Sequence, residues 1–345
     1  MFIIIRFIWL NCDISVWNKY YGSDTTPATY NKNKTINDAG NCFVDETFFS
    51  FLNPNGVIRI EGSQNTKLLV STSTFLSCSN SNTSSKHGGC IYLNQGQCIS
   101  YQVCSSKCST LNEGSYCKTV VSDSSSKNYI LLSSIHSGNS QYNSFYFRNG
   151  DVLVSLVNDT NNIANYNPAF YIEQSDYFCI NYSYFNGNKA TSGEVIFRFY
   201  SYSPSESYSC VFLNNLNVDL GSGIFGLYFV GNYTFKECII KSNQHKNLFY
   251  SGSSSIYIYV INCLIEENIC SVTLSGDAQT QFEITTNLPI KLSLYSTEEC
   301  PIEEGANDNN GCDNQFQVCN QEKTADRPNS GMRPNIYCIF ISLRK

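Results

Sequence analysis

The sequence predicts an all-β protein, a parallel β-helix of roughly nine coils followed by an irregular C-terminal tail. A repeat of about 27 residues runs between residues 40 and 270, and a fixed period in this range indicates a solenoid or another repeat array. Short apolar runs rich in Ile, Val, Phe and Tyr recur in each period and favour strands. No stretch has the apolar spacing of an amphipathic helix. An antiparallel β-sandwich and a leucine-rich repeat are the alternatives, but no L-x-x-L-x-L-x-x-N run recurs.

The N-terminal residues are predicted to form a leader and a cap. Residues 1–12 are an apolar run interrupted by Arg6, too short for a bilayer span of about 20 residues. They are similar to an abbreviated signal peptide, although a basic start and a small-x-small cleavage site are missing. A truncated or misassigned start is the alternative. Residues 13–40 are expected to form the N-terminal cap of the β-helix.

The β-helix is predicted over residues 41–290, where four copies of the repeat align by eye. Each copy has a small residue, two apolar residues, two variable residues and Asn: 183–188, 210–215, 238–243 and 263–268. With the third residue as an anchor, weaker copies are expected at Phe49, Phe75, Tyr101, Ile135 and Val157. A second apolar run follows each anchor after roughly ten to sixteen residues, so each coil should hold two or three short strands.

Successive side chains along a strand point to opposite faces, so alternate residues of each repeat copy should point into the β-helix. The predicted inward stack consists of Cys210, Phe212, Cys238, Ile240, Cys263 and Ile265. The asparagines that end the copies are expected at tight turns, because Asn tolerates left-handed backbone angles; they are Asn188, Asn215, Asn243 and Asn268. In stacked coils their side chains could also form an Asn ladder.

The character of the chain changes over residues 291–345. An acidic, Asn-rich stretch begins at Cys300, strand-like runs are sparse, and Pro328 and Pro334 interrupt the chain. A Cys/Asn-rich cap or a disordered tail is predicted. The apolar run at 337–341 is far too short to cross a bilayer, so no transmembrane segment is expected.

The composition argues against nucleic-acid binding and leaves the state of the cysteines open. The 345 residues carry a formal net charge of −6 and only 14% are charged, so extended basic patches are not expected. The 17 cysteines are many for a cytosolic protein. Those of the inward stack are predicted to be buried thiols. Disulfides are expected, if the chain is secreted, within two clusters: Cys90, Cys98, Cys104, Cys108 and Cys117, and Cys300, Cys312 and Cys319. A zinc site in the first cluster is disfavoured, because the paired C-x₂-C pattern is missing.

No catalytic, cofactor-binding or metal site is predicted. No Asp-Asp pair occurs, and the aspartates within the coils are isolated and at different repeat phases. His87, His136 and His245 lie in different coils and lack the spacing of an H-E-x-x-H site. Five Asn-x-Ser/Thr sequons are glycosylation candidates that support a secretory route: Asn33, Asn82, Asn158, Asn181 and Asn232.

A family resemblance is carried by the segment from Asn41 to Tyr116. Its motifs are residues 41–44, residues 68–70 with 74–78, and Gly-Gly-Cys-Ile-Tyr-Leu at 88–93. The Gly-Gly-x-Ile-Tyr run, with downstream Phe-x-x-Asn or Phe-x-x-Cys turns, resembles polymorphic-outer-membrane-protein-like sequences. It is particularly similar to the Cys- and Asn-rich β-helix surface proteins of protists. This resemblance implies a right-handed helix, secretion and a role in adhesion, and it brings no catalytic residues. Such proteins often end in a membrane anchor, and this chain departs from that pattern.

These observations predict a secreted or cell-surface protein that is not an enzyme and that binds host-cell or extracellular glycans or proteins. Outward tyrosines such as Tyr184 and Tyr257 are the expected contacts. A polysaccharide lyase or hydrolase on a pectate-lyase-like β-helix is one alternative, which clustering of acidic and basic side chains on one face would favour. A degenerate family copy without activity is the other.

Overall fold

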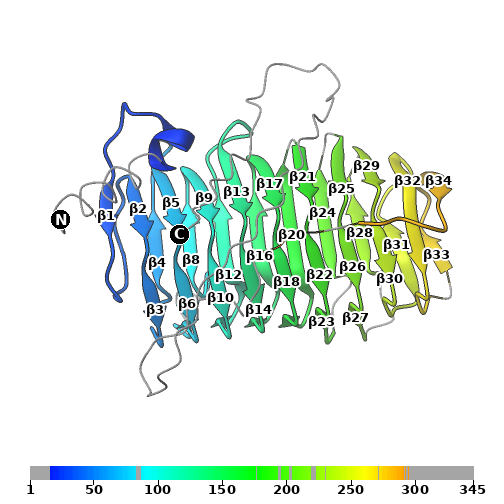
Figure 1. Cartoon of the computed structure of the whole chain (residues 1–345), viewed down its shortest axis with the longest axis horizontal. Helices are drawn as coiled ribbons and strands as arrows, with labels where there is room; N and C mark the ends of the chain where they lie inside the picture. Colours follow the sequence, from blue (N-terminus) through cyan, green and yellow to red (C-terminus); the bar gives the residue numbers. More distant parts are fainter. Residues whose placement is uncertain are drawn as a thin grey trace, which may run out of the picture. The chain divides into compact units, whose positions relative to one another are not determined.

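The described part of the chain is nearly all β, and the predicted parallel β-helix of about nine coils is confirmed. The computed structural model describes residues 16–82, 87–175, 177–192, 196–201, 204–218, 223–229, 231–270, 272–290, 292 and 294. Successive coils stack in chain order, from blue to yellow in Figure 1. The leader predicted at residues 1–12 and nearly all of the tail predicted at 291–345 lie outside the described residues.

Each coil has up to four sides, which we number in chain order. Side 1 comprises β1 (Ala28–Tyr30), β2 (Cys42–Asp45), β5 (Lys67–Ser71), β9 (Gln97–Tyr101), β13 (Lys127–Leu131), β17 (Asp151–Ser155), β21 (Tyr177–Asn181), β25 (Ser205–Tyr208), β29 (Gly231–Lys236), the first part of β32 (Ile256–Glu266) and β34 (Gln279–Ile284). Side 2 comprises β3 (Phe48–Ser50), β6 (Thr74–Leu76), β10 (Cys104–Ser106), β14 (Ser134–His136), β18 (Asn158–Thr160), β22 (Tyr184–Asn186), β26 (Val211–Leu213), β30 (Ile239–Lys241) and the end of β32.

Sides 3 and 4 complete the coil and form separate sheets of 6 and 9 strands. Side 3 comprises β7 (Ser79–Asn80), β11 (Ser109–Thr110), β15 (Asn139–Ser140), β19 (Ile163–Ala164), β23 (Lys189–Ala190) and β27 (Leu216–Asn217). Side 4 comprises β4 (Ile58–Glu61), β8 (Ile91–Asn94), β12 (Glu113–Val120), β16 (Asn143–Arg148), β20 (Asn167–Ser175), β24 (Phe197–Ser201), β28 (Phe225–Tyr228), β31 (Asn247–Ser251) and β33 (Val272–Ser275).

The strand register places one inward residue of each coil over its counterparts on side 2. These residues are Phe49, Phe75, Ser105, Ile135, Asp159, Phe185, Phe212, Ile240 and Ile265. The anchors expected at Tyr101 and Val157 are wrong, and Ser105 and Asp159 take their places. The alignment failed in these two coils because their inward residue is polar, so a nearby apolar residue fitted the pattern better.

A single left-handed residue forms each corner beside side 2. Between sides 1 and 2 its φ is 45–57°, at Glu46, Thr72, Gln102, Leu132, Leu156, Tyr182, Ser209, Glu237 and Asn262. Between sides 2 and 3 its φ is 50–68°, at Phe51, Ser77, Lys107, Ser137, Asn161, Gly187, Asn214, Ser242 and Glu267. This backbone costs a non-Gly residue roughly 1–2 kcal/mol, so hydrogen bonds must hold the corners.

The small residue after the first corner supplies these hydrogen bonds. The Ser183 hydroxyl donates to the carbonyl of Asn181 at 2.9 Å and accepts from the Val157 amide of the preceding coil at 3.1 Å. The Cys238 thiol makes the equivalent contact with the Lys236 carbonyl at 3.4 Å. This bonding explains why the repeat copies begin with Ser or Cys.

Stacked phenylalanines fill the interior between sides 2 and 4. Phe185 stacks on Phe212 with centroids 5.1 Å apart, and Phe197 stacks on Phe225 across side 4 at 5.1 Å. The two stacks meet edge to face, since Phe185 and Phe197 lie 5.3 Å apart at 82°. Such aromatic pairs each contribute about 0.5–1.5 kcal/mol beyond the area they bury.

The N-terminal described residues pack against side 1. Residues 16–21 are helical, and Trp17 lies 6.2 Å from Phe43 of β2, centroid to centroid. The Tyr21 hydroxyl donates to the carbonyl of Leu68 at 2.9 Å. Strand β1 lies within the cap predicted at residues 13–40. It pairs with β2 of the first predicted coil and adds a further strand to side 1.

Candidate binding face

The outward residues of side 4 form an aromatic and charged surface, which we call the side 4 face. In β20, Phe170 and Ile172 are buried, whereas Tyr171 and Glu173 point outward and are half-buried. The register stacks such outward residues into two columns. The first column holds Arg59, Tyr92, Lys118, Tyr146, Tyr171, Arg198, Gly226 and Tyr250. The second holds Glu61, Asn94, Val120, Arg148, Glu173, Tyr200 and Tyr228.

Five tyrosines in five successive coils make a continuous aromatic row on this face. They are Tyr146, Tyr171, Tyr200, Tyr228 and Tyr250, and neighbouring centroids are 5.1, 5.7, 4.6 and 5.7 Å apart. Tyr200 and Tyr228 are parallel within 6°, whereas Tyr146 and Tyr171 are at 89°. The aromatic row therefore presents ring edges, hydroxyls and some ring faces rather than one uniform surface.

Basic side chains lie over these rings. The Arg198 guanidinium carbon is 5.3, 4.9 and 4.8 Å from the centroids of Tyr171, Tyr200 and Tyr228. The Lys118 Nζ is 5.0 Å from the centroid of Tyr146. Burial alone would lower the pKa of Arg198, but its hydrogen bond with the Tyr200 hydroxyl and the nearby phenols hold that pKa above its ordinary value. Arg198 is therefore a fixed positive charge within the aromatic row.

Carboxylates on side 4 neutralise part of this positive charge. Glu113 Oε2 lies 2.6 Å from Lys118 Nζ and 3.1 Å from His87 Nδ1. Burial opposes ionisation of Glu113, yet the adjacent His87 imidazole and the hydrogen bond from Lys118 hold its pKa below the ordinary value. The Tyr146 hydroxyl donates to Glu173, and burial together with this carboxylate raises the pKa of Tyr146, so the phenol stays protonated.

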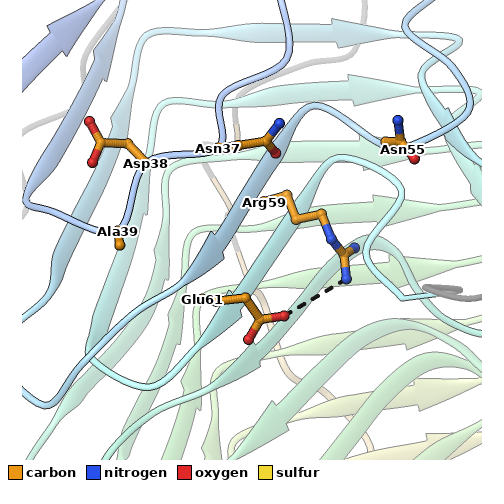
Figure 2. Close-up of a pocket in the computed structure, with 6 residues that line it drawn as sticks. All are labelled: Asn37, Asp38, Ala39, Asn55, Arg59 and Glu61. Atoms are coloured by element: carbon orange, nitrogen blue, oxygen red, sulfur yellow. Dashed lines mark ion pairs between the residues drawn. The ribbon is translucent and has the colours of Figure 1, made fainter.

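A pocket of about 350 Å³ opens where the first column begins (Figure 2). It is lined by Asn37, Asp38 and Ala39 from the loop after β1, by Asn55, and by Arg59 and Glu61 of β4. Arg59 Nη2 lies 4.0 Å from Glu61 Oε1, and the guanidinium carbon lies 4.4 Å from the centroid of Tyr92. Hydrogen bonds from the Tyr30 hydroxyl and the Gly40 amide hold the pKa of Asp38 below its ordinary value. Arg59 therefore belongs both to the pocket and to the side 4 face.

The residues of the predicted inward stack lie at the interior of the coils. Cys210, Phe212, Cys238, Ile240 and Cys263 are each 0% exposed, whereas Ile265 is only partly buried against the core. The cysteines occupy corner positions, from which the thiols of Cys210 and Cys238 contact carbonyls two residues earlier at 3.4 Å.

The four predicted turn asparagines form a hydrogen-bonded ladder, which the register extends to Asn162. The Asn215 side-chain amide donates to Asn243 Oδ1 at 2.9 Å, and the Asn243 amide donates to Asn268 Oδ1 at 3.0 Å. At the other end Asn162 donates to Asn188 Oδ1 at 3.2 Å, and Asn215 Oδ1 accepts from the Asn188 backbone amide at 3.1 Å. The expected left-handed backbone lies one residue before each ladder asparagine.

Asp159, which is an isolated acidic residue in the sequence, is a buried carboxyl group in the structure. It is 0% exposed and accepts hydrogen bonds from the side-chain amides of Asn162 and Asn188 at 2.6 and 3.0 Å. Burial nevertheless raises its pKa well above the ordinary value. Its position below the ladder indicates a structural role.

The five sequons differ in accessibility. Asn33 is exposed in a bend, and Asn82 is half-buried with its amide 2.8 Å from Asn55 Oδ1. The other three are half-buried on strands β18, β21 and β29: Asn158, Asn181 and Asn232. Asn33 is therefore the most accessible glycosylation candidate among them.

The cysteines of the first cluster are mostly free thiols, contrary to the expected disulfides. Cys90, Cys98, Cys108 and Cys117 are unpaired and buried, whereas Cys104 is disulfide-bonded. The second cluster lies outside the described residues. Across the described ranges, no group of three or more His, Cys, Asp or Glu is placed to hold a metal ion. A search of the same residues finds no helix with the length and apolar character of a membrane span.

The tyrosines singled out from the sequence lie on other sides of the coil. Tyr184 is on β22 of side 2, and Tyr257 is on β32 in side 1. The second apolar run of each repeat predicts a strand, but the outward residues of this strand differ between coils and give no repeat signal. Aligning those runs in register would have placed Tyr146, Tyr171 and Arg198 in one outward column.

Comparison with known proteins gives no match to a family model, to a curated protein or to a solved structure.

Proposed function

We propose that the protein is a secreted or cell-surface β-helix that is not an enzyme and that binds extracellular glycans through the side 4 face. The observation that carries this proposal is the aromatic row, with Arg198 and Lys118 set among its rings. Tyrosines combine an apolar ring with a hydroxyl at low conformational-entropy cost, which suits them to contact with sugars. The exposed sequon at Asn33 supports a secretory route.

The arrangement of the aromatic row also indicates how a ligand would lie. Hydrogen-bonded coils follow one another at about 4.8 Å, so the five tyrosines mark a path of roughly 20 Å along the stack. The side chains are held by one another and by the basic residues between them, and little ordering entropy is lost on binding. A chain-like ligand that contacts several coils matches this surface better than a compact one.

A double substitution tests the proposal. Tyr171→Ala with Tyr200→Ala removes two adjacent rings and the support of Arg198, and should lower glycan-array signal at least tenfold. The matched control is Tyr182→Ala with Tyr208→Ala, which removes another tyrosine pair, 5.4 Å apart, at the corner beside side 1. Circular dichroism should show both variants folded. Equal binding by the wild type and by the variant with Tyr171→Ala and Tyr200→Ala would refute the proposed face.

A polysaccharide lyase or hydrolase is a second candidate, favoured by the group of Glu113, His87 and Lys118. The Glu113 carboxylate lies 2.6 Å from the Lys118 amine and 3.1 Å from the His87 imidazole, beside the aromatic row. A carboxylate, an imidazole and an amine can move protons between them. Incubation with acidic polysaccharides tests this candidate: release of reducing ends that Lys118→Ala abolishes would support it, and intact polymer would contradict it.

A further inference from the structure

We infer that the pocket beside Arg59 is a terminal subsite for a hydroxyl-rich sugar that carries no carboxylate, at the end of a glycan chain. This inference rests on the proposed function, because it names the class of ligand that the side 4 face would hold. Its basis is that the pocket opens at the first residue of the first column (Figure 2). A chain that follows the column from Tyr92 toward the N-terminal coil would reach the pocket.

The size and lining of the pocket suit a single sugar. Its volume of about 350 Å³ is at the lower end of the range for small-molecule sites, roughly 300–1,000 Å³. Asn37 and Asn55 supply amides, Asp38 and Glu61 supply carboxylates, and Arg59 supplies a guanidinium. This mixture of donors and acceptors matches hydroxyl groups, each of which can both donate and accept.

The charge of the lining disfavours an acidic sugar. Asp38 and Glu61 provide two carboxyl groups against one guanidinium, and hydrogen bonds from Tyr30 and Gly40 favour the ionised form of Asp38. Both carboxylates already have partners, since Glu61 Oε2 accepts from the Asn94 amide at 2.9 Å. The remaining acceptor capacity faces a neutral ligand without repulsion, whereas a uronate would meet an excess of negative charge.

Arg59 links the pocket to the column. Its guanidinium lies 4.4 Å above the Tyr92 ring, and its Nη1 is buried without a hydrogen-bond partner among the described residues. A buried donor without a partner is costly, so a bound sugar oxygen that engages Nη1 after a small rotation would remove that cost. The same guanidinium can then contact a sugar in the pocket while Tyr92 contacts the next one.

The test uses the full chain on an array that carries neutral and uronate-containing oligosaccharides. The wild type should bind neutral chains in preference to uronate-containing chains. Arg59→Ala and Asn37→Ala should each lower the neutral signal at least fivefold. Glu61→Gln removes a negative charge from the lining, so it should increase the binding of uronate chains relative to that of neutral chains. Lys34→Ala, an exposed residue outside the pocket, is the control.

The outcomes separate this inference from the proposed function. If the Tyr171 and Tyr200 variant loses binding but Arg59→Ala and Asn37→Ala do not, the pocket inference fails and the side 4 face stands. Preference of the wild type for uronate chains also overturns the inference. If no oligosaccharide binds, both proposals fail. If Arg59→Ala unfolds at the same temperature as the wild type, its loss of binding is not caused by a loss of the fold.

Discussion

Asp159 occupies an inward position that is Phe or Ile in most coils, such as Phe185 directly above it. Two side-chain amides reach its oxygens, yet burial still raises its pKa. Asp159 therefore binds more protons in the native state than in the unfolded chain between its ordinary pKa of 3.8 and the raised value. The contribution of Asp159 to stability should consequently fall as pH rises from about 4 toward the raised pKa.

Asp159→Leu should reveal the effect of the buried Asp159 carboxyl group on the free energy of unfolding. Leu keeps the branched shape, while Asn188 can still donate to the backbone carbonyl at 3.3 Å and Asn162 to Asn188 Oδ1 at 3.2 Å. We expect the variant to be about 1–4 kcal/mol more stable than the wild type at pH 7. Urea unfolding at several pH values should show this difference shrinking as pH falls to 4. A difference that is constant, or that grows in acid, would contradict a raised pKa.

The buried thiols lead to a second prediction. Burial raises the pKa of Cys98 to about 12 and that of Cys238 well above its ordinary value, so neither carries a reactive thiolate near pH 8. Iodoacetamide should leave both unmodified in the native protein and label both in guanidinium chloride. Cys270, which is half-buried, should react before both of them in the native state. Peptide mass spectrometry that finds Cys238 labelled before Cys270 would disprove the prediction.

At the scale of the element, much of side 2 could be read from the sequence and much of side 4 could not. Side 2 carries the repeat signature because its corners need a small hydrogen-bonding residue at one end, as at Ser183, and Asn at the other, as at Asn215. Side 4 has no such corner requirement on its outward residues. Tyr171 and Arg198 therefore vary between coils, and only the register reveals that they share a column.

The ladder beside side 2 can be tested at Asn215. Its amide donates to Asn243 Oδ1 and to the Phe185 carbonyl at 3.1 Å, and its Oδ1 accepts from the Asn188 amide. Asn215→Ala leaves the Asn188 backbone amide without this partner, at about 1–3 kcal/mol. It also removes one donor each from the Phe185 carbonyl and from Asn243 Oδ1, which still accepts from the backbone amide of residue 215 at 3.0 Å. Chemical denaturation should therefore show a loss of at least about 1 kcal/mol. The exposed Gln244→Ala should change stability little; equal effects would argue against the ladder.

At the scale of the whole β-helix, contacts run between neighbouring coils, so stability should be local. Such arrays behave as a sum of repeat and nearest-neighbour terms. The number of coils was predictable because the inward residues recur, as at Phe75 and Phe212. The packing of residues 16–21 on side 1 was not, because a helical segment so short gives no periodic pattern.

Phe212→Ala tests this locality. Phe212 is fully buried and contacts Phe185, Phe197 and Phe225. Its truncation should cost roughly 3–5 kcal/mol. Hydrogen exchange should show loss of protection in strands β22 to β31, with β5 and β9 unchanged. Leu213→Ala, at the half-buried neighbour, is the control. Uniform loss of protection along all coils would contradict local stability.

The central claim is that the side 4 face is the surface that binds ligand, and hydroxyl-radical footprinting tests it most directly. The protein would be oxidised with and without the best-binding oligosaccharide from the array. We expect protection of Tyr171, Tyr200 and Tyr228, with Tyr184 and Tyr257 on sides 2 and 1 unchanged. Protection of Tyr184 or Tyr257, with the aromatic row oxidised as before, would contradict it.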